Sequence, residues 1–178
     1  MKKFLFYEKK ENSNKFLYLI ICIGLLAGLL IKLFIFEILT VSGDSMTPAI
    51  NNGEHIFVNK LKYGLVKPYG ETLLVQWNKP KRGDIVIYLY NNKIVVKRCL
   101  AISGDLLEYS TDNDYNYFLM TGNQTITLSE NQYLNLKDSS AVPEGYILAV
   151  GDNYSVSVDS RTYGFVPERN ILGKVLCK

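Results

Sequence analysis

An unbroken apolar run near the amino terminus, residues 16–36, constrains this chain more than any other feature. The run reads FLYLIICIGLLAGLLIKLFIF, and its single charge, Lys32, lies one turn from its end. A helix of about 20 apolar residues crosses the hydrocarbon core of a bilayer, and a lysine near its end can extend the ammonium group to the headgroups. A cleaved secretory signal usually has a shorter apolar region. The sequence therefore predicts a retained transmembrane anchor helix over residues 16–36.

The distribution of charge predicts the orientation of that anchor. The net charge of +3 arises in the first fifteen residues, which are rich in lysine, whereas the chain beyond the anchor is balanced. Basic residues next to an anchor favour the cytoplasmic side. We predict a cytoplasmic arm over residues 1–15, a single pass through the plasma membrane, and an extracytoplasmic domain over residues 37–178. The excess charge is therefore a topology signal, so the bilayer is a predicted partner and nucleic acid is not.

Beyond the anchor, the residue pattern is typical of a mainly β domain. Short runs rich in Val, Ile, Phe and Tyr, such as EHIFVNK and DIVIYLY, are separated by Gly, Pro, Asn and Asp. We predict a compact, antiparallel, barrel-like sheet with a hairpin turn at Asn91–Asn92. The run LVQW is predicted to form a hairpin that dips into the membrane interface, where Trp is favoured. Residues 106–145 are predicted to form a small hairpin or mobile loop.

Ser45, in the stretch VSGDSMTPAI, is the candidate nucleophile. A serine hydroxyl attacks a carbonyl only when a base takes its proton, so the sequence must supply a base. The one histidine, His55, alternates with Ile56 and Val58, which are expected to face inward. His55 is therefore predicted to face solvent, and a Ser-His arrangement is disfavoured.

Lys97 is the better candidate base. It lies in the apolar strand NNKIVVKRCLAISGD and shares a face with Val95 and Cys99, while Arg98 points the other way. Burial among apolar neighbours lowers the pKa of a lysine, because the charged form is penalised. The alternative is an edge-strand lysine that points to water.

A second polar stretch, GDNYSVSVDSRTYGFVP, is dense in serines and turn-forming residues. Ser155, Ser157 and Asp159 alternate with valines, and a serine there could orient the lysine. Asp159 and Arg161 are predicted to share a strand face and to pair. The alternative is a surface loop held by local side-chain to backbone bonds.

The sequence favours neither a metal nor a cofactor. With one histidine and no CxxC pair, the chain lacks the usual ligands of a structural zinc site. Cys99 and Cys177 could form a disulfide, but their spacing leaves this open.

Four stretches, in order along the chain, resemble the conserved boxes of the bacterial type I signal peptidases: SGDSMTP, KRGDIVIY, VVKRCLAISGD and GDNYSVSVDSRTYGFVP. The resemblance implies a membrane-anchored serine endopeptidase that cleaves secretory preproteins with a Ser-Lys dyad. Ser45 would be the nucleophile and Lys97 the general base. Ser157 would orient the lysine, and Asp159 and Arg161 would form a structural ion pair.

The same resemblance implies how the oxyanion and the substrate are bound. The backbone N–H of Ser45 would be one oxyanion donor, whereas Gly43 stands where some family members carry a serine donor. The family prefers small residues at positions −1 and −3 before the cut. The pockets implied for them are formed by Val41, Ser42, Met46, Ile50, Ile56, Ile87, Val95 and Val96.

Three alternatives remain beside this interpretation. A self-cleaving repressor-type Ser-Lys protease would be soluble and bind DNA, which the anchor and the balanced charge disfavour. A maturation peptidase with one dedicated substrate, such as a conjugation or pilus factor, would share the fold and the chemistry. An inactive anchored binding module would show no covalent labelling of Ser45.

Overall fold

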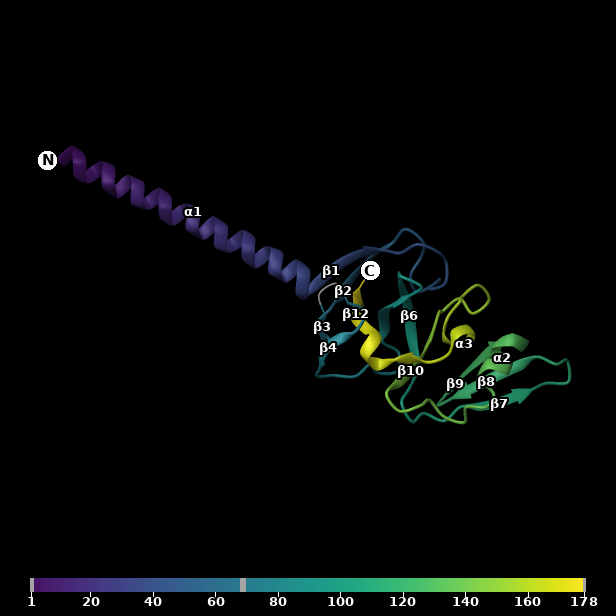
Figure 1. Cartoon of the computed structure of the whole chain (residues 1–178). Helices are drawn as coiled ribbons and strands as arrows, with labels where there is room; N and C mark the ends of the chain where they lie inside the picture. Colours follow the sequence, from purple (N-terminus) through teal and green to yellow (C-terminus); the bar gives the residue numbers. More distant parts are fainter. Residues whose placement is uncertain (1, 68–69, 178) are drawn as a thin grey trace.

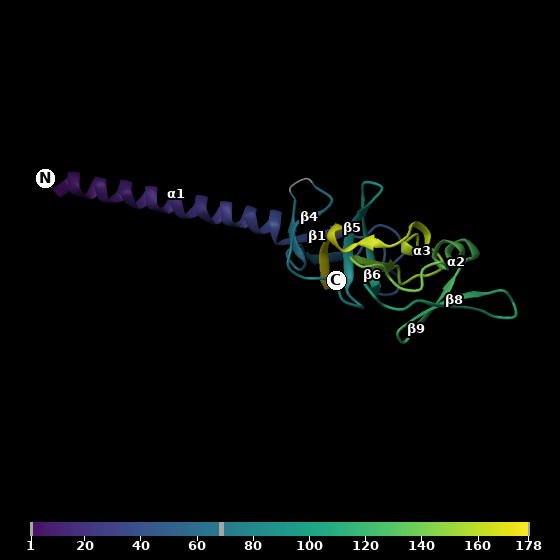
Figure 2. The same ribbon diagram turned by 60° about the horizontal axis from the view of Figure 1, so that its bottom comes forward.

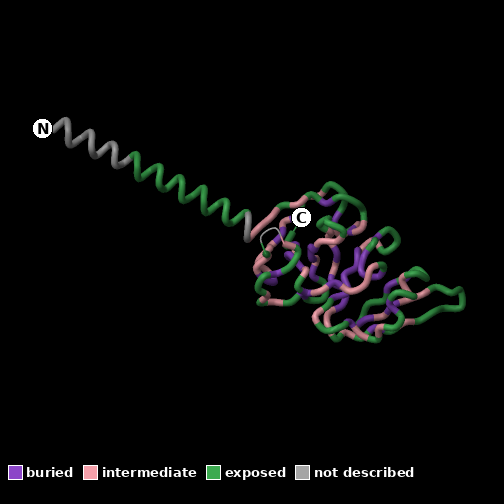
Figure 3. The backbone as a smooth tube through the Cα atoms, viewed as in Figure 1, coloured by how far each residue is buried: buried purple, intermediate pink, exposed green. Residues whose placement is uncertain are grey.

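A long amino-terminal helix leads into a β-rich domain in the computed structural model, which describes residues 2–67 and 70–177 (Figure 1). Helix α1 (Lys2–Phe34) projects away from the domain. Within it, the stretch Asn14–Lys32 is long and apolar enough to cross a membrane, and its side chains are exposed throughout. Figure 3 shows the contrast, because the buried residues gather in the domain and not along the helix.

The anchor ends slightly earlier than the sequence predicted. Helix α1 stops at Phe34, and strand β1 (Phe36–Thr40) begins almost at once. Phe36 pairs with Asn59 in the sheet and stacks on Phe57, with ring centroids 4.9 Å apart. The final residue of the predicted span therefore belongs to the domain, and the connection from α1 to the sheet is short.

Within the described ranges, twelve strands form three antiparallel sheets. The strands are β1 (Phe36–Thr40), β2 (His55–Asn59), β3 (Gly64–Val66), β4 (Leu73–Gln76), β5 (Ile85–Tyr90), β6 (Lys93–Ile102), β7 (Glu108–Thr111), β8 (Tyr117–Thr121), β9 (Gln124–Leu128), β10 (Tyr146–Val150), β11 (Val166–Pro167) and β12 (Ile171–Cys177). Beyond the anchor, the helical elements are α2 (Glu130–Leu136), α3 (Ser160–Tyr163) and the 3-10 turn η1 (Glu168–Asn170). The predicted mainly β, antiparallel class is confirmed.

The main sheet has the order β1-β2-β12-β5-β6-β10-β11. Strands β5 and β6 form the predicted hairpin, since Tyr90 pairs with Lys93 and both turn residues, Asn91 and Asn92, have positive φ angles of 50° and 59°. Asparagine tolerates this left-handed conformation better than most residues do. Strand β6 pairs with β5 over its first half and reaches β10 only from Arg98 onward.

Residues 106–145 are more structured than the predicted hairpin or mobile loop. They contain a three-stranded sheet, β7-β8-β9, followed by helix α2. One face of this unit carries the buried side chains Leu119, Ile126 and Leu136, which belong to the same core cluster as Leu148 of the main sheet. The sequence of this unit is polar because only alternate strand positions are buried, and the three short strands leave the other face exposed.

The predicted hairpin that contains LVQW is also present. Strands β3 and β4 pair with each other, and β4 leaves Leu74 and Val75 exposed at 58% and 53%. Trp77 follows at 56% exposure, with its indole N–H donating to the carbonyl of Leu61 at 3.0 Å. In both Figure 1 and Figure 2 the hairpin lies beside the junction between α1 and β1, at the anchor end of the domain.

Candidate active site

Ser45 lies in the turn between β1 and β2, and apolar side chains of this turn pack into the core of the domain. Val41, Met46 and Ile50 are buried at 8%, 1% and 2% exposure and belong to one core cluster. The backbone N–H of Val41 also donates to the carbonyl of Glu54 at 2.9 Å, which ties the start of the turn to its end. The half-buried Ser45 therefore lies in a turn that packs on the hydrophobic core and follows the edge strand β1.

Lys97 of β6 reaches Ser45 across the sheet. The Lys97 Nζ and Ser45 Oγ atoms are hydrogen-bonded at 2.7 Å. The lysine is only 4% exposed, as predicted from its shared face with Cys99, which is completely buried. This burial is the main reason why the pKa of Lys97 is lowered; Asp159 acts to raise it and Arg161 to lower it. A neutral amine in contact with a hydroxyl is the arrangement that can remove the serine proton.

His55 does not compete for the role of base. It is exposed, as the alternation with Ile56 predicted, and its Nδ1 atom lies 3.0 Å from Thr40 Oγ1. The imidazole thus contacts the neighbouring edge strand and not the hydroxyl of Ser45.

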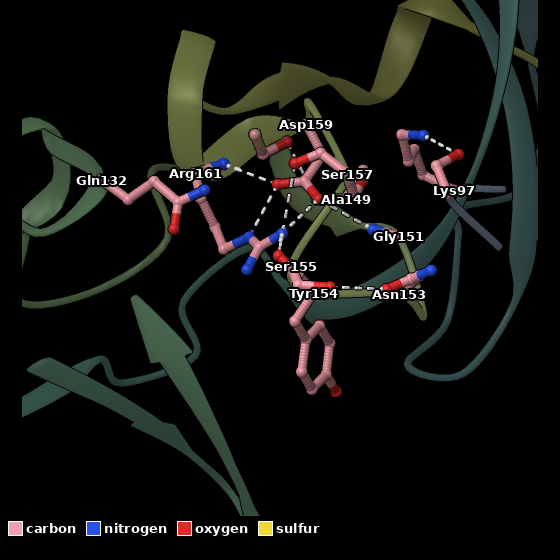
Figure 4. A network of polar contacts seen from close by, with 12 residues as sticks. Lys97, Gln132, Ala149, Gly151, Asn153, Tyr154, Ser155, Ser157, Asp159 and Arg161 are labelled. Carbon is pink, nitrogen blue, oxygen red and sulfur yellow. Dashed lines mark hydrogen bonds and ion pairs between the residues drawn. The ribbon is translucent and has the colours of Figure 1, made fainter. Parts of the chain in front are cut away.

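Asp159 and Arg161 form the predicted ion pair, but not on a strand face. Asp159 caps helix α3 and Arg161 lies in its first turn; Nε and Nη2 of Arg161 each donate to an Asp159 carboxylate oxygen at 2.9 Å. Both residues are completely buried, at 0% exposure. Figure 4 shows the pair at the centre of a network, with Gly151 and Tyr154 on its sides. The valines that alternate with polar residues here, Val156 and Val158, are exposed, so their spacing resembled a strand that does not form.

Gly151 lies between this network and the Ser45 turn. Its N–H donates to Asp159 Oδ2 at 2.9 Å. A Cβ atom on Gly151 would lie 2.2 Å from Ser157 Oγ and 2.4 Å from the carbonyl oxygen of Ser45, which is too close for any real contact. Only glycine lets the polar loop approach the Ser45 turn this closely.

Ser157 is the one predicted dyad partner whose contact is not formed. The side chain is buried, at 5% exposure, and its Oγ atom has no hydrogen-bond partner among the described residues. The structure places it beside Gly151 and does not form the predicted bond to Lys97.

Two further residues of the polar loop were missed by the sequence reasoning. Asp152 accepts two hydrogen bonds from Arg98, at 2.7 Å and 2.6 Å, which ties the loop to the outer face of β6. Asn153 contacts the carbonyls of Asp44 and Ser45. The stretch GDN predicted only a turn, because the residues that Asp152 and Asn153 bind lie more than fifty positions away in the sequence.

A pocket of about 180 Å³ opens beside the dyad. Its walls come from the end of β1, the Ser45 turn, β2 and the first half of β6. The lining residues are Leu39, Thr40, Val41, Ser42, Ser45, Met46, Ile56, Ile94, Val95, Val96 and Lys97.

Six of the eight predicted pocket residues line this space. The two exceptions are Ile50 and Ile87, which are each 2% exposed and lie in the core cluster beneath the pocket. Leu39, Thr40 and Ile94 line it and were not predicted. The alternation along the strands identified the apolar positions. It could not distinguish core residues next to the pocket from residues that line it.

The described residues hold no group of three His, Cys, Asp or Glu side chains that could bind a metal ion. Cys99 and Cys177 are free thiols, the first buried and the second exposed.

The chain is similar to proteins of one family. The family model described as "Signal peptidase, peptidase S26" matches residues 13–178. Signal peptidase IB of Staphylococcus aureus (strain Mu50 / ATCC 700699) is 32% identical over 161 residues, covering 80% of this chain and 76% of that protein. Signal peptidase I of Buchnera aphidicola subsp. Baizongia pistaciae is 27% identical over 218 aligned positions, covering 83% and 70%. Among solved structures, a signal peptidase I from Enterococcus faecalis V583 matches at 30% identity and a TM-score of 0.38, covering 56% of this chain and 97% of that one.

Proposed function

This chain belongs to the signal peptidase family, peptidase S26, and we propose that it removes signal peptides from secretory preproteins with Ser45 as nucleophile and Lys97 as general base. The observation that carries this assignment is the 2.7 Å contact between Lys97 Nζ and Ser45 Oγ at the wall of a pocket. A serine hydroxyl is a weak nucleophile until a base takes its proton, and a neutral lysine amine is such a base.

The chemistry follows from the two groups. Neutral Lys97 takes the proton of Ser45 as Oγ attacks the carbonyl carbon of the residue before the cut. The resulting ammonium returns a proton to the leaving amine when the peptide bond breaks. Lys97 then takes a proton from a water molecule, which hydrolyses the ester on Ser45. The backbone N–H of Ser45 is the proposed donor to the oxyanion that forms in both halves of the reaction.

The rate is expected to rise with pH. Because Lys97 must be neutral to act as a base, kcat should increase as pH passes through its lowered pKa and should level off above it. The midpoint should lie below the ordinary pKa of a lysine, of about 10.4, because burial penalises the charged amine. The measurement is kcat on a soluble peptide from about pH 5 to about pH 10. A maximum near the acidic end would rule out Lys97 as the base.

The strand edges beside the pocket support a binding mode for the substrate. Strand β1 is the edge of the main sheet, and the first half of β6 pairs only with β5 among the described strands. Both unpaired edges border the pocket, so an extended peptide can lie between them and pair with their backbone groups. The pocket is smaller than the 300 Å³ or so at which pockets for drug-sized ligands begin. This size supports small residues at positions −1 and −3.

The assignment is tested by incubating the detergent-solubilised protein with purified preproteins and sequencing the new amino termini. Cleavage is expected after a small residue, with another small residue two positions earlier. Substrates with leucine at either position should be cleaved at least tenfold more slowly, because the pocket cannot hold the added carbons. A panel of unrelated preproteins separates the alternatives: processing of one alone indicates a dedicated maturation peptidase, and processing of none indicates a binding module.

The exposed apolar groups near the anchor support a placement of the domain against the bilayer. The β3–β4 hairpin lies at the same end of the domain as helix α1 (Figure 2). Leu74 and Val75 of β4, and Trp77 just after it, are exposed. Residues 1–15 are proposed to be cytoplasmic, the anchor to cross the plasma membrane once, and the domain to be extracytoplasmic. The hairpin would then rest in the interface, where Trp is favoured, with the pocket facing the end of a membrane-embedded signal peptide.

Removal of the anchor should separate two kinds of substrate. A variant that begins at Ile35 keeps β1 and should still fold, because Phe36 retains its sheet partner Asn59 and its stacking on Phe57. Its rate on soluble peptides should stay within about twofold of the full chain, whereas its rate on preproteins in vesicles should fall at least tenfold through the lost local concentration. Initial rates on both substrates give the ratio. Equal losses would mean that the anchor has a purely structural role.

A further inference from the structure

The candidate oxyanion donor, the N–H of Ser45, belongs to the peptide bond between Asp44 and Ser45. In a planar trans peptide the N–H and the C=O point in opposite directions, so the group that holds one of them also directs the other. The only cis bond among the described residues is Thr47–Pro48, so the Asp44–Ser45 bond is trans. Whatever holds the carbonyl of Asp44 therefore sets the direction of the donor.

Two donors hold that carbonyl: the backbone N–H of Thr47 inside the turn, at 3.2 Å, and Asn153 from the polar loop. Asn153 Nδ2 donates to the carbonyl oxygen of Asp44 at 3.2 Å, and the backbone N–H of Asn153 donates to the carbonyl oxygen of Ser45 at 3.0 Å. One residue thus reaches the carbonyls on both sides of the nucleophile. Among the described residues the N–H of Ser45 itself has no hydrogen-bond acceptor, which leaves it available for a substrate oxygen.

The amide of Asn153 is itself held in place. Ser155 Oγ donates to Asn153 Oδ1 at 3.0 Å (Figure 4). The NH2 side of the amide is thereby left to donate to the carbonyl of Asp44. The backbone N–H of Ser157 also donates to the carbonyl of Asn153 at 3.0 Å, which closes the turn. The side chain is therefore part of a short chain of hydrogen bonds that ends on the peptide plane of the nucleophile.

We propose that Asn153 is a positioning residue for the oxyanion site: together with the N–H of Thr47, its side-chain amide fixes the Asp44–Ser45 peptide so that the Ser45 N–H faces the developing negative charge. The inference rests on the proposed function. Among the described residues no hydrogen bond joins Asn153 to Ser45 Oγ or to Lys97, so its proposed role does not include proton transfer. Its contribution appears where the oxyanion forms, which is in the transition state and not in the bound substrate.

The test compares Asn153→Ala and Asn153→Asp with the full-length wild type in detergent. Both variants lose the Nδ2–H donor and keep the backbone N–H that binds the carbonyl of Ser45. Complete loss of an oxyanion donor costs about 10²- to 10³-fold in kcat, so a misdirected one should cost about 10- to 100-fold. KM should stay within about twofold. Asn135→Ala is the matched control, because Asn135 Nδ2 also donates to a backbone carbonyl, that of Thr162, away from the site.

Two further measurements separate positioning from damage to the loop. A peptide aldehyde, which adds to Ser45 to give a tetrahedral oxyanion, should bind Asn153→Ala more weakly by about the same factor as kcat falls. An uncleaved substrate peptide should bind Ser45→Ala equally well with and without the second change. The pH midpoint of kcat should not move in Asn153→Ala, because that change alters no charge and removes no hydrogen bond of Lys97. Ser155→Ala, which removes only the bond that orients the amide, should lower kcat in the same way but less.

Three results would overturn the inference: an unchanged kcat in both Asn153 variants, a loss that appears in KM alone, or equal weakening of the aldehyde and of the uncleaved peptide. Its failure is distinguishable from failure of the proposed function. If Ser45→Ala retains activity, the nucleophile has been assigned wrongly. If Ser45→Ala is inactive while Asn153→Ala cleaves at the wild-type rate, only the role of Asn153 is wrong.

Discussion

Ser45→Ala and Lys97→Met are each expected to lower kcat by at least about 10⁴-fold, because removing either member of a nucleophile–base pair removes most of the catalysis. Ser45 Oγ is the proposed nucleophile, and among the described residues Lys97 is the only amine hydrogen-bonded to it, at 2.7 Å. The double variant should be no slower than the slower single variant, since the two groups act as a unit. Single-turnover cleavage of a preprotein and of a short peptide measures both losses.

Stability provides the control for this experiment. The folded state lowers the pKa of Lys97, so at neutral pH it binds protons less readily than the unfolded chain. The unfolding free energy should therefore rise with pH, from the lowered pKa up to the unfolded value of about 10.4, and Lys97→Met should lose this rise. The variant should be at least as resistant to urea as wild type near pH 7. If Lys97→Met cleaves normally while His55→Ala does not, the base is His55.

The contact between Ser45 and Lys97 could be predicted from the sequence because its signals are local. Lys97 stands in an apolar run whose alternation places it on the face of Cys99, and the structure buries both. Ser45 lies in a turn next to buried Val41 and Met46, and the packing of these two side chains holds the turn in place. Each assignment needed only neighbours within a few positions, together with the resemblance in four stretches.

The polar loop could not be predicted to the same depth, because its contacts are made at long range. The alternation of serines with Val156 and Val158 resembles a strand, yet Asp159 caps a short helix instead and its carboxylate binds the N–H of Gly151. Burial of Arg161 at 0% exposure decides this outcome, since a buried guanidinium needs acceptors on several sides. No local sequence pattern predicts that the loop folds around the side chain of Arg161.

The unit at residues 106–145 shows a second limit. Its strands are short and polar on one face, so the sequence indicated little more than a hairpin. The buried positions Leu119 and Ile126 lie on neighbouring strands and meet Leu136 of α2 only after the sheet has formed. Ser129 caps the start of the helix: its hydroxyl accepts from the N–H of Gln132, while the Gln132 side chain accepts from the N–H of Ser129. That cap was readable in the sequence as S-x-x-Q.

Breaking the Asp159–Arg161 pair is expected to cause the largest loss of stability among single changes in the domain. Removing one partner of a buried ion pair typically costs about 3 to 5 kcal/mol, because the other charge is left uncompensated. Arg161→Leu leaves the Asp159 carboxylate with the N–H of Gly151 and its own helix N–H as donors. Asp159→Asn leaves the guanidinium without a compensating charge, with one side-chain oxygen and backbone carbonyls such as that of Tyr154 as its acceptors. Urea unfolding monitored by circular dichroism measures both costs.

The ion pair between Lys79 and Glu168 is the comparison for that loss. Its N···O distance is 3.2 Å, and the lysine side chain is 65% exposed whereas that of Glu168 is 6% exposed. Because the lysine is solvated, Lys79→Gln should cost less than Arg161→Leu, in which both partners are buried. Arg161→Lys keeps the charge but not the planar fork that reaches both carboxylate oxygens, so its cost should lie between those of Lys79→Gln and Arg161→Leu. A cost for Arg161→Leu as small as that for Lys79→Gln would show that the buried pair does not hold the loop.

The same two changes should move the pH profile of catalysis in opposite directions. Asp159 raises the pKa of Lys97 and Arg161 lowers it, although burial is the larger influence on that amine. Arg161→Leu removes a repelling charge and keeps the attracting one, so the pKa of Lys97 should rise and the midpoint of kcat should move to higher pH. Asp159→Asn should move the midpoint to lower pH for the opposite reason. Profiles are recorded in low salt, at a temperature where both variants remain folded. Because a general weakening of the loop would shift both midpoints the same way, only opposite shifts support electrostatic control of the lysine by the buried pair.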